Sequence, residues 1–225
     1  MKLLEVIPIM KGISKETLTY FTSKDAPVGS IVKVPIRKKT ISGIVLSLQE
    51  VADAKSSIKG SDYQIKKIEN IRPCDLVLPE FIEASKDMAN YLASSTGSVI
   101  NSIIPKSILL NSDRLKFEIK KAEKISRPHE KFVLQADDEE RYANYRSLIR
   151  EEFAKGFSIF FCLPTIQDIK KTFEILSKGI EQYAFILHSG LSKKEISETW
   201  MKILNEPHPA LIIATGSFLS IPRSD

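Results

Sequence analysis

Residues 26 to 48 carry two apolar, β-branched runs on either side of a short basic cluster. The runs extend from Ser30 to Ile36 and from Thr40 to Leu48, and the cluster is Arg37, Lys38 and Lys39. Such runs are typical of β-strands, so this stretch predicts a hairpin with three positive charges at its tip. We expect its strands to line a small barrel and its tip to face solvent. Charged turns are common, so a solubilising loop is the alternative interpretation of the tip.

The composition is that of a globular protein with one or two domains. The chain has 225 residues, of which 43% are hydrophobic and 27% charged. No run of 18 apolar residues exists, and the first twelve residues are interrupted by Glu5 and Pro8. We therefore expect neither a membrane span nor a signal peptide, no membrane partner, and a cytoplasmic location.

The cysteines and histidines are scattered. Cys74 and Cys162 have no CxxC spacing, and the three histidines lie far apart in the sequence. This pattern indicates no metal site, no disulfide framework and no cofactor, and it predicts that both cysteines are buried.

The net charge of +5 is concentrated in the front of the chain. Residues 1 to 111 contain 15 Lys and Arg against 11 Asp and Glu, a net charge of +4, which leaves +1 for residues 112 to 225. The front half is therefore the better candidate for binding a polyanion.

The periodicity of the sequence changes along the chain and predicts two domains. Residues 2–9, 17–22 and 63–69 read as further short strands, followed by a helix opening at Pro79 and a second helix from Ser98 to Ile104. A charged stretch at 112–130 then predicts a linker between a β-rich domain, 1–111, and a second domain, 131–225. The second domain alternates apolar runs with amphipathic helices, as in a parallel α/β sheet. Its expected strands are Phe132–Leu134, Phe157–Leu163, Tyr183–Leu187 and Ala210–Ala214, with helices around 138–155, 167–178 and 193–204.

Four blocks in the front half carry a resemblance to a known family. They are TLTYF (17–21), VGSIVKVPI followed by SGIVLSL (28–48), IKKIENI (65–71) and YLASSTGSVINSIIP (91–105). Their order and spacing resemble the 3′ DNA-binding domain of the primosomal protein N′ (PriA) family, the bacterial replication-restart helicases. This resemblance implies a domain that holds the 3′ end of the nascent leading strand at a stalled fork. It also implies forked DNA or a single-stranded 3′ end as the partner, and replication-restart proteins as further partners.

Three blocks in the back half are similar to the start of the same family's first helicase lobe, which has a RecA-like α/β fold. They are FFCLPTIQDI (160–169), LHSGLSKKEISETW (187–200) and IIATGSFLSIP (212–222). The family's phosphate-binding loop aligns with residues 135–142, which read QADDEERY. This stretch lacks the glycines, the lysine and the hydroxyl that cradle a triphosphate and its Mg²⁺. The chain also stops before an acidic Mg²⁺-binding motif.

The resemblance assigns DNA-binding roles to seven residues, and it leaves alternatives open. They are Leu18, Thr19, Tyr20, Arg37, Lys38, Lys39 and Lys66. Tyr20 would stack on a terminal base, although most tyrosines in such positions are core residues. Lys66 would contact a phosphate, or it is the solvated face of an alternating strand. Thr19 stands where the family has Asp, which predicts a weaker preference for a free 3′-hydroxyl.

Other conspicuous residues in the back half have structural explanations. His188 and Ser189 lack a recognisable acidic partner, so no catalytic residue is assigned, and Trp200 and Phe173 are expected to be core residues. Two functions remain open, beside the alternative of a remnant with no activity. The first is a DNA-binding protein for stalled forks without its own ATPase, and the second is a fragment or divergent form of an ATP-dependent 3′-5′ helicase.

Overall fold

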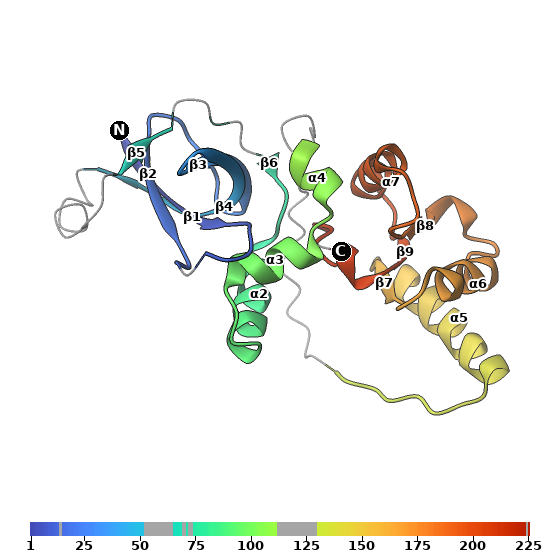
Figure 1. The fold of residues 1–225 in the computed structure, drawn as a ribbon. Coiled ribbons are helices and arrows are strands. Elements are labelled where there is room, and N and C mark those ends of the chain that lie inside the picture. Colours follow the sequence, from blue (N-terminus) through green and yellow to red (C-terminus); the bar gives the residue numbers. More distant parts are fainter. Residues whose placement is uncertain (14, 52–64, 69–70, 72–73, 112–129, 224) are drawn as a thin grey trace. The chain divides into compact units, whose positions relative to one another are not determined.

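The structure, a computed structural model, describes residues 1–13, 15–51, 65–68, 71, 74–111, 130–223 and 225. The chain divides into two compact units, Met1–Glu118 (unit 1) and Ile119–Asp225 (unit 2), and each has its own sheet (Figure 1). The predicted linker, 112–130, falls almost wholly outside the described residues, so its boundaries stay a prediction. In the described ranges no helix is long and apolar enough to cross a membrane.

Unit 1 is built on a curled six-stranded sheet with the strand order β5-β2-β1-β4-β3-β6. Every pairing is antiparallel except that of β2 with β5, which is parallel. The strands are β1 (Lys2–Pro8), β2 (Leu18–Thr22), β3 (Ser30–Ile36), β4 (Lys39–Glu50), β5 (Lys66–Lys67) and β6 (Cys74–Asp75). The predicted hairpin and barrel-like fold are thus confirmed. The two short strands β5 and β6 form the outer edges of this open half-barrel.

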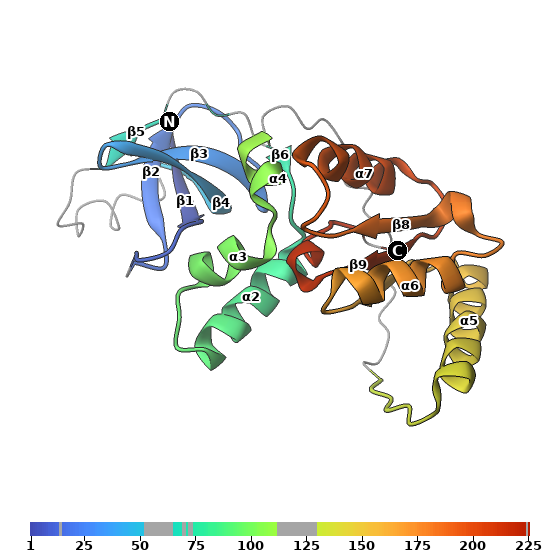
Figure 2. The same cartoon turned by 45° about the vertical axis from the view of Figure 1, so that its right-hand side comes forward.

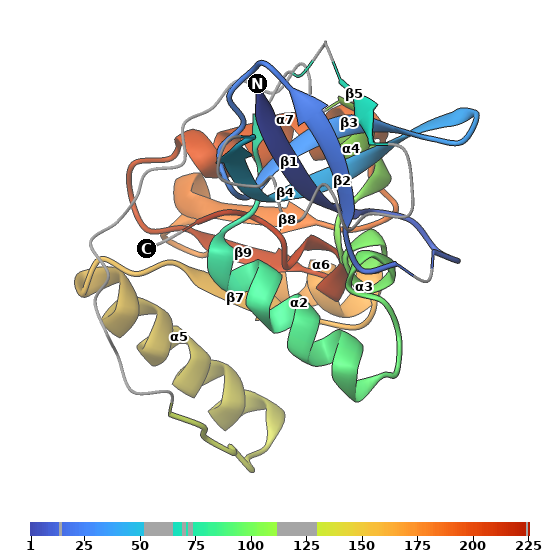
Figure 3. The ribbon, with the colours of Figure 1, turned by 90° about the vertical axis from the view of Figure 1, so that its left-hand side faces the viewer.

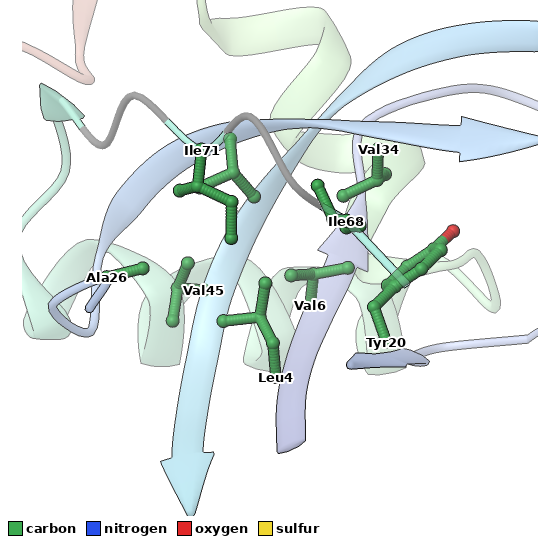
Figure 4. Close-up of a cluster of buried hydrophobic side chains, with 9 residues drawn as sticks. Leu4, Val6, Tyr20, Ala26, Val34, Val45, Ile68 and Ile71 are labelled. Carbon is green, nitrogen blue, oxygen red and sulfur yellow. The ribbon is translucent and has the colours of Figure 1, made fainter. Parts of the chain in front are cut away.

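The inner face of this sheet holds one core cluster of unit 1, and Ile7, Ile31 and Ile44 are buried on the other face. Alternate residues of each strand point inward, because successive side chains of a β-strand lie on opposite faces. Leu4 and Val6 of β1, Tyr20 of β2, Val32 and Val34 of β3 and Val45 of β4 form one buried cluster with Ala26, Ile68 and Ile71. Figure 4 shows these side chains gathered between the strands. Ile68 and Ile71 close the cluster from the segment that follows β5.

Two glycines permit close packing around β1. Gly43 of β4 is a point of close approach to β1. A Cβ atom at Gly43 would lie 3.3 Å from the carbonyl oxygen of Ile7. The pairing of β1 with β4 has a bulge opposite Glu5 and Val6, where Leu46 is the extra residue of β4. A Cβ atom at Gly97 would lie 1.9 Å from the carbonyl oxygen of Pro8, so helix α3 (Thr96–Ile103) requires glycine where it meets β1.

The predicted helices of unit 1 are present, and one more follows them. Helix α2 (Pro79–Tyr91) begins at the predicted proline, and α3 begins two residues before the predicted Ser98. Helix α4 (Lys106–Asn111) was not predicted, because Pro105 follows the predicted helix and prolines commonly end helices. Instead, the Pro105 carbonyl accepts hydrogen bonds from Ile108 and Leu109, so the proline precedes a new first turn.

Unit 2 contains a parallel three-stranded sheet in the order β7-β9-β8, with helices around it (Figure 2). This α/β architecture was predicted. Its elements are α5 (Asp138–Ala154), β7 (Ile159–Cys162), α6 (Ile166–Leu176), β8 (Ala184–Leu187), α7 (Lys193–Asn205) and β9 (Leu211–Ala214). All four residues of the central strand β9 are buried, and Trp200 of α7 is fully buried, as expected.

Two expectations for unit 2 were wrong. Phe132–Leu134 is not a strand, and Phe132 and Val133 are 84% and 99% exposed. These three apolar residues have no neighbouring strand to pair with among the described residues, and a strand is stable only when its backbone groups are paired. Cys162 was expected to be buried, but it is exposed at the end of β7. Strand β7 lies at an edge of the three-stranded sheet, so its residues are less covered than those of the central strand β9.

Arg223 holds the end of the described chain against α7. Its guanidinium donates hydrogen bonds to the carbonyl oxygens of Glu206 (3.1 Å) and His208 (3.0 Å) and pairs with Asp225. The Asp225 carboxylate also accepts from the Ser158 hydroxyl at 2.8 Å, and that hydroxyl accepts from the backbone N–H of Ala210. Burial alone would raise the pKa of Asp225, but the hydrogen bonds from Arg223 and Ser158 outweigh it and lower the pKa.

Replacing Arg223 by Ala should destabilise unit 2 by about 2–3 kcal/mol, because it leaves carbonyl groups and a half-buried carboxylate without their charged donor. Trp200 is the only tryptophan in the chain, so its fluorescence during urea unfolding reports on unit 2 alone. The exposed Lys193→Ala is the control and should leave the transition unchanged. Because the folded-state pKa of Asp225 is lowered, its stabilisation should be present at neutral pH and lost as the pH falls through that folded-state value. An Arg223→Ala transition identical to that of the parent would contradict this role.

Candidate nucleic-acid interface

The basic cluster lies at the end of the β3–β4 hairpin, which projects from the sheet (Figure 3). Ile36 pairs with Lys39, so Arg37 and Lys38 form a two-residue turn and Lys39 is the first residue of β4. All three cationic side chains are exposed. None of the three has an ion pair or hydrogen bond within the described part of the chain that would neutralise it. The turn therefore presents three uncompensated charges to solvent.

The backbone of the turn is strained at Arg37. Its φ angle is +52°, in the left-handed region where an L side chain costs roughly 1–2 kcal/mol. Two-residue hairpin turns normally place glycine or asparagine in this conformation. The six residue pairs between β3 and β4 hold the turn in place despite this strain. An arginine here is thus fixed in direction by the ladder below it.

Tyr20 is a buried residue beneath the hairpin. Its side chain is 4% exposed, and its hydroxyl donates a hydrogen bond to the carbonyl oxygen of Pro35 at 3.1 Å. Figure 4 shows the ring beside Val34 and Ile68. Burial raises the pKa of the hydroxyl, so it stays protonated and remains a donor. In this conformation the ring is covered, and stacking on a base, which stays a prediction, would require the ring to be uncovered.

The structure brings Lys66 next to Tyr20, although 45 residues separate them in the sequence. Strand β5 pairs with β2 so that Lys66 lies opposite Tyr20, and the N–H of Ile68 donates to the carbonyl oxygen of Phe21 at 2.7 Å. Lys66 is exposed at the edge of the sheet. Tyr20 thus pairs with Lys66 on one side and donates a hydrogen bond to Pro35, two residues before Arg37, on the other. It lies between the edge of the sheet and the basic turn.

Thr19 lies on the opposite face of the sheet from Tyr20. It pairs with Glu5 of β1, and Glu5 in turn pairs with Ser47 of β4, whose hydroxyl donates to the Glu5 carboxylate at 3.2 Å. Leu18 is on the same face as Tyr20 and packs against the inner core. The predicted residues therefore divide between two faces. Sequence reasoning missed Glu5, although a lone carboxylate between Leu4 and Val6 signals an outward-facing position in an alternating strand.

Residues 135–142, compared above with a phosphate-binding loop, include the start of α5. Asp137 is the N-cap, and its carboxylate accepts a hydrogen bond from the N–H of Glu140 at 2.9 Å. The first turn also carries Asp138, Glu139 and Glu140, which favour the helix through its dipole. A phosphate at the start of a helix binds to free backbone N–H groups. Here the Asp137 carboxylate already accepts a hydrogen bond from one of these groups.

The HSG turn after β8 has a structural explanation in its hydrogen bonds. His188 is 5% exposed, and its Nδ1 accepts a hydrogen bond from the N–H of Gly190 at 3.1 Å. Burial lowers the pKa of the imidazole, helped by the nearby charge of Lys170. The neutral ring therefore closes the turn that leads into the capping box of Ser192 and Glu195 at the start of α7.

Comparison with known proteins gives one match. Residues 6–105 match the family model of the PriA 3′ DNA-binding domain (3′BD). A search of curated proteins found no match to the chain. The matched range begins in β1 and extends through α3, so it contains the sheet from Val6 onward, the basic turn, Tyr20 and Lys66. This part of the chain is similar to a PriA 3′ DNA-binding domain, and the match supports 3′ DNA binding of the PriA replication-restart type.

Proposed function

We propose that this protein binds the 3′ end or the branch of DNA at stalled replication forks, through unit 1, in replication restart. The observation that carries the proposal is the match of residues 6–105 to the PriA 3′ DNA-binding domain. The site it implies is formed by the basic turn and the edge of the sheet, with Leu18, Thr19, Tyr20, Arg37, Lys38, Lys39 and Lys66 as the contacting residues. Replication-restart proteins are the further partners that this role implies.

Electrostatics supports the hairpin as the phosphate-contacting part of this site. Arg37, Lys38, Lys39 and Lys66 are exposed cations, and phosphate contacts supply most of the affinity of proteins for DNA. A two-residue turn fixed by a β-ladder loses little conformational freedom when it binds, because its backbone is already ordered. The backbone of the turn therefore loses little conformational entropy when its charges bind DNA.

Recognition of the strand end is a separate part of the proposal. Thr19, where the family has Asp, offers a 3′-hydroxyl only a neutral hydroxyl group. The carboxylate nearest in register is that of Glu5, on the outer face of the sheet. We therefore keep a weakened preference for a free 3′-hydroxyl as part of the proposed function.

We also propose that the protein works without its own ATPase. The start of α5 supports this, because Asp137 caps the helix and three more carboxylates follow it. Four negative charges there would repel a triphosphate, and the transition state of phosphoryl transfer would lack stabilising donors.

Replacing Arg37, Lys38 and Lys39 together by Ala should weaken binding to forked and single-stranded DNA of every sequence. With three to four phosphates neutralised, the slope of log K against log salt should be roughly −2 to −3 for the parent, and the triple variant should flatten it by about 2. Fluorescence anisotropy at several salt concentrations measures both quantities. The control removes three exposed lysines of unit 2, Lys170, Lys193 and Lys202, and should keep the parent's slope. A triple variant that binds as tightly as the parent at all salt concentrations would leave the solubilising-loop interpretation.

Replacing Tyr20 by Leu should cost about 1–3 kcal/mol of affinity for single-stranded 3′ ends if a base stacks on the ring, whereas Tyr20→Phe should keep the affinity. Tyr20→Phe should lower the stability of unit 1 by about 1 kcal/mol, because it removes the hydrogen bond to Pro35. Anisotropy gives the affinities, and far-ultraviolet circular dichroism during denaturation gives the stabilities. Unchanged affinity of the Leu variant would contradict stacking and leave Tyr20 as a core residue that supports the turn.

The purified protein should neither bind nor hydrolyse ATP, because the carboxylates at the start of α5 repel its phosphates. Calorimetric titration with Mg·ATP should give no heat of binding, and phosphate release should not rise on addition of forked DNA. Micromolar affinity for Mg·ATP would overturn this part of the proposal and favour the ATP-dependent helicase. DNA binding through the basic turn would be unaffected by that result.

A further inference from the structure

Helix α5 is packed against the rest of unit 2 along a narrow side only. Ile149 is its single buried residue in 17 positions, with Tyr142, Tyr145 and Phe153 partly covered on the same side. Figure 3 shows the helix at the margin of unit 2. The apolar residues just before it, Phe132 to Leu134, are exposed as well. A helix with so little cover, preceded by exposed apolar side chains, has surface available for a partner.

The charges on one uncovered face of α5 are separated along its length. At 100° per residue, Glu139, Ala143, Arg146, Ser147 and Arg150 lie on one face, and all five are exposed. The acidic end is reinforced by Glu140, whereas Asp138 is paired with Arg141 and Lys171. Ala143 and Ser147, in the middle of the face, are small enough for another helix to approach closely.

A cavity of about 210 Å³ lies beside the basic end of this face. Its apolar floor includes Ile149, Leu176 and Ile180, and its rim is formed by Arg146, Arg150 and Lys178. A cavity of about 150 Å³ can hold a benzene ring, so this one can accept a single leucine or phenylalanine side chain.

The cations at the rim of this cavity are available to a ligand. Arg150 and Lys178 have no ion pair or side-chain hydrogen bond within the described residues, and Arg146 makes one long bond, 3.4 Å, to the Tyr142 carbonyl. The neighbouring carboxylates are already engaged. Glu151 and Glu152 hold Lys155, and Glu181 accepts from the N–H of Gly179. The rim is therefore a net positive surface around an apolar opening.

We propose that two copies of this chain associate through antiparallel α5 helices, so that Glu139 of each copy meets Arg150 of the other. The segment that complements the cavity is residues 132–140 of a second copy. In this segment three exposed apolar residues, Phe132 to Leu134, come shortly before the carboxylates at the start of α5. Within one chain, the seventeen residues of α5 separate these two features by about 25 Å. An antiparallel neighbour brings them together.

The symmetry of this arrangement makes it a closed dimer. Residues 139 and 150 are equally distant from the centre of the face, and so are residues 143 and 146, so a twofold axis through that centre forms each contact twice. Small Ala143 then lies opposite the long Arg146 of the neighbour. Phe132 and Leu134 of each copy extend past Arg150 of the other toward its cavity. A self-complementary patch of this kind closes with two copies and leaves no end for further growth.

Sedimentation equilibrium of the full chain, at low salt and over a wide concentration range, tests the proposal. The weight-average mass should rise from 25.3 kDa toward twice that value. Arg150→Glu and Glu139→Arg should each remain at the monomer mass, because each places like charges together at both contacts. An equimolar mixture of the two variants should recover the parent's association, because every contact again joins opposite charges.

Two matched reversals at exposed positions of α6, Lys170→Glu and Glu174→Arg, are the controls and should associate like the parent. Circular dichroism confirms that each variant is folded before its mass is interpreted. A parent that stays at the monomer mass at every concentration would overturn the proposal. So would single reversals that still associate, or a mixture that does not recover association.

Discussion

The pairing of β1 with both β2 and β4 is the constraint on which unit 1 depends. Its register sets Leu4 beside Tyr20 and Leu48 on the inner face, and Glu5 beside Thr19 and Ser47 on the outer face. A shift of one residue would exchange these faces and expose the core. The bulge at Leu46 of β4 keeps both Val45 and Leu48 on the inner face opposite β1. The positions of Tyr20, Lys66 and the hairpin tip all follow from this one register.

The basic turn is held by that framework from below. The hydroxyl of Tyr20 fixes Pro35, and Lys33 of β3 donates hydrogen bonds to the Ser42 hydroxyl and to the Leu109 carbonyl at the end of α4, each at 2.8 Å. These contacts and the β3–β4 ladder offset the strain at Arg37, which glycine would avoid. The turn thus combines an ordered backbone with exposed charges. That combination suits phosphate contacts, which depend on charge more than on exact geometry.

In unit 2 the carboxylates at the start of α5 have two physical effects. Asp137 and the acids after it stabilise the first turn of α5, because its unpaired N–H groups and dipole attract negative charge. They also make this helix start repulsive to phosphate. The stabilisation is local, so α5 forms without extensive burial, and most of its surface is left uncovered. Arg223 secures the other side of the unit by joining the end of α7 to Asp225.

Local pattern in the sequence determined the elements, and tertiary structure decided which of them meet. Alternating and continuous apolar runs predicted the hairpin, β1, β2 and the three strands of unit 2, because burial imposes those patterns directly on the chain. Phe132–Leu134 has the same apolar character and is not a strand, since a strand exists only where a neighbour supplies hydrogen bonds. The residues of the candidate site could be named from the sequence through resemblance. Only the register placed Lys66 beside Tyr20, turned Thr19 toward Glu5 and buried the Tyr20 ring, because these outcomes depend on pairings between segments far apart in the chain.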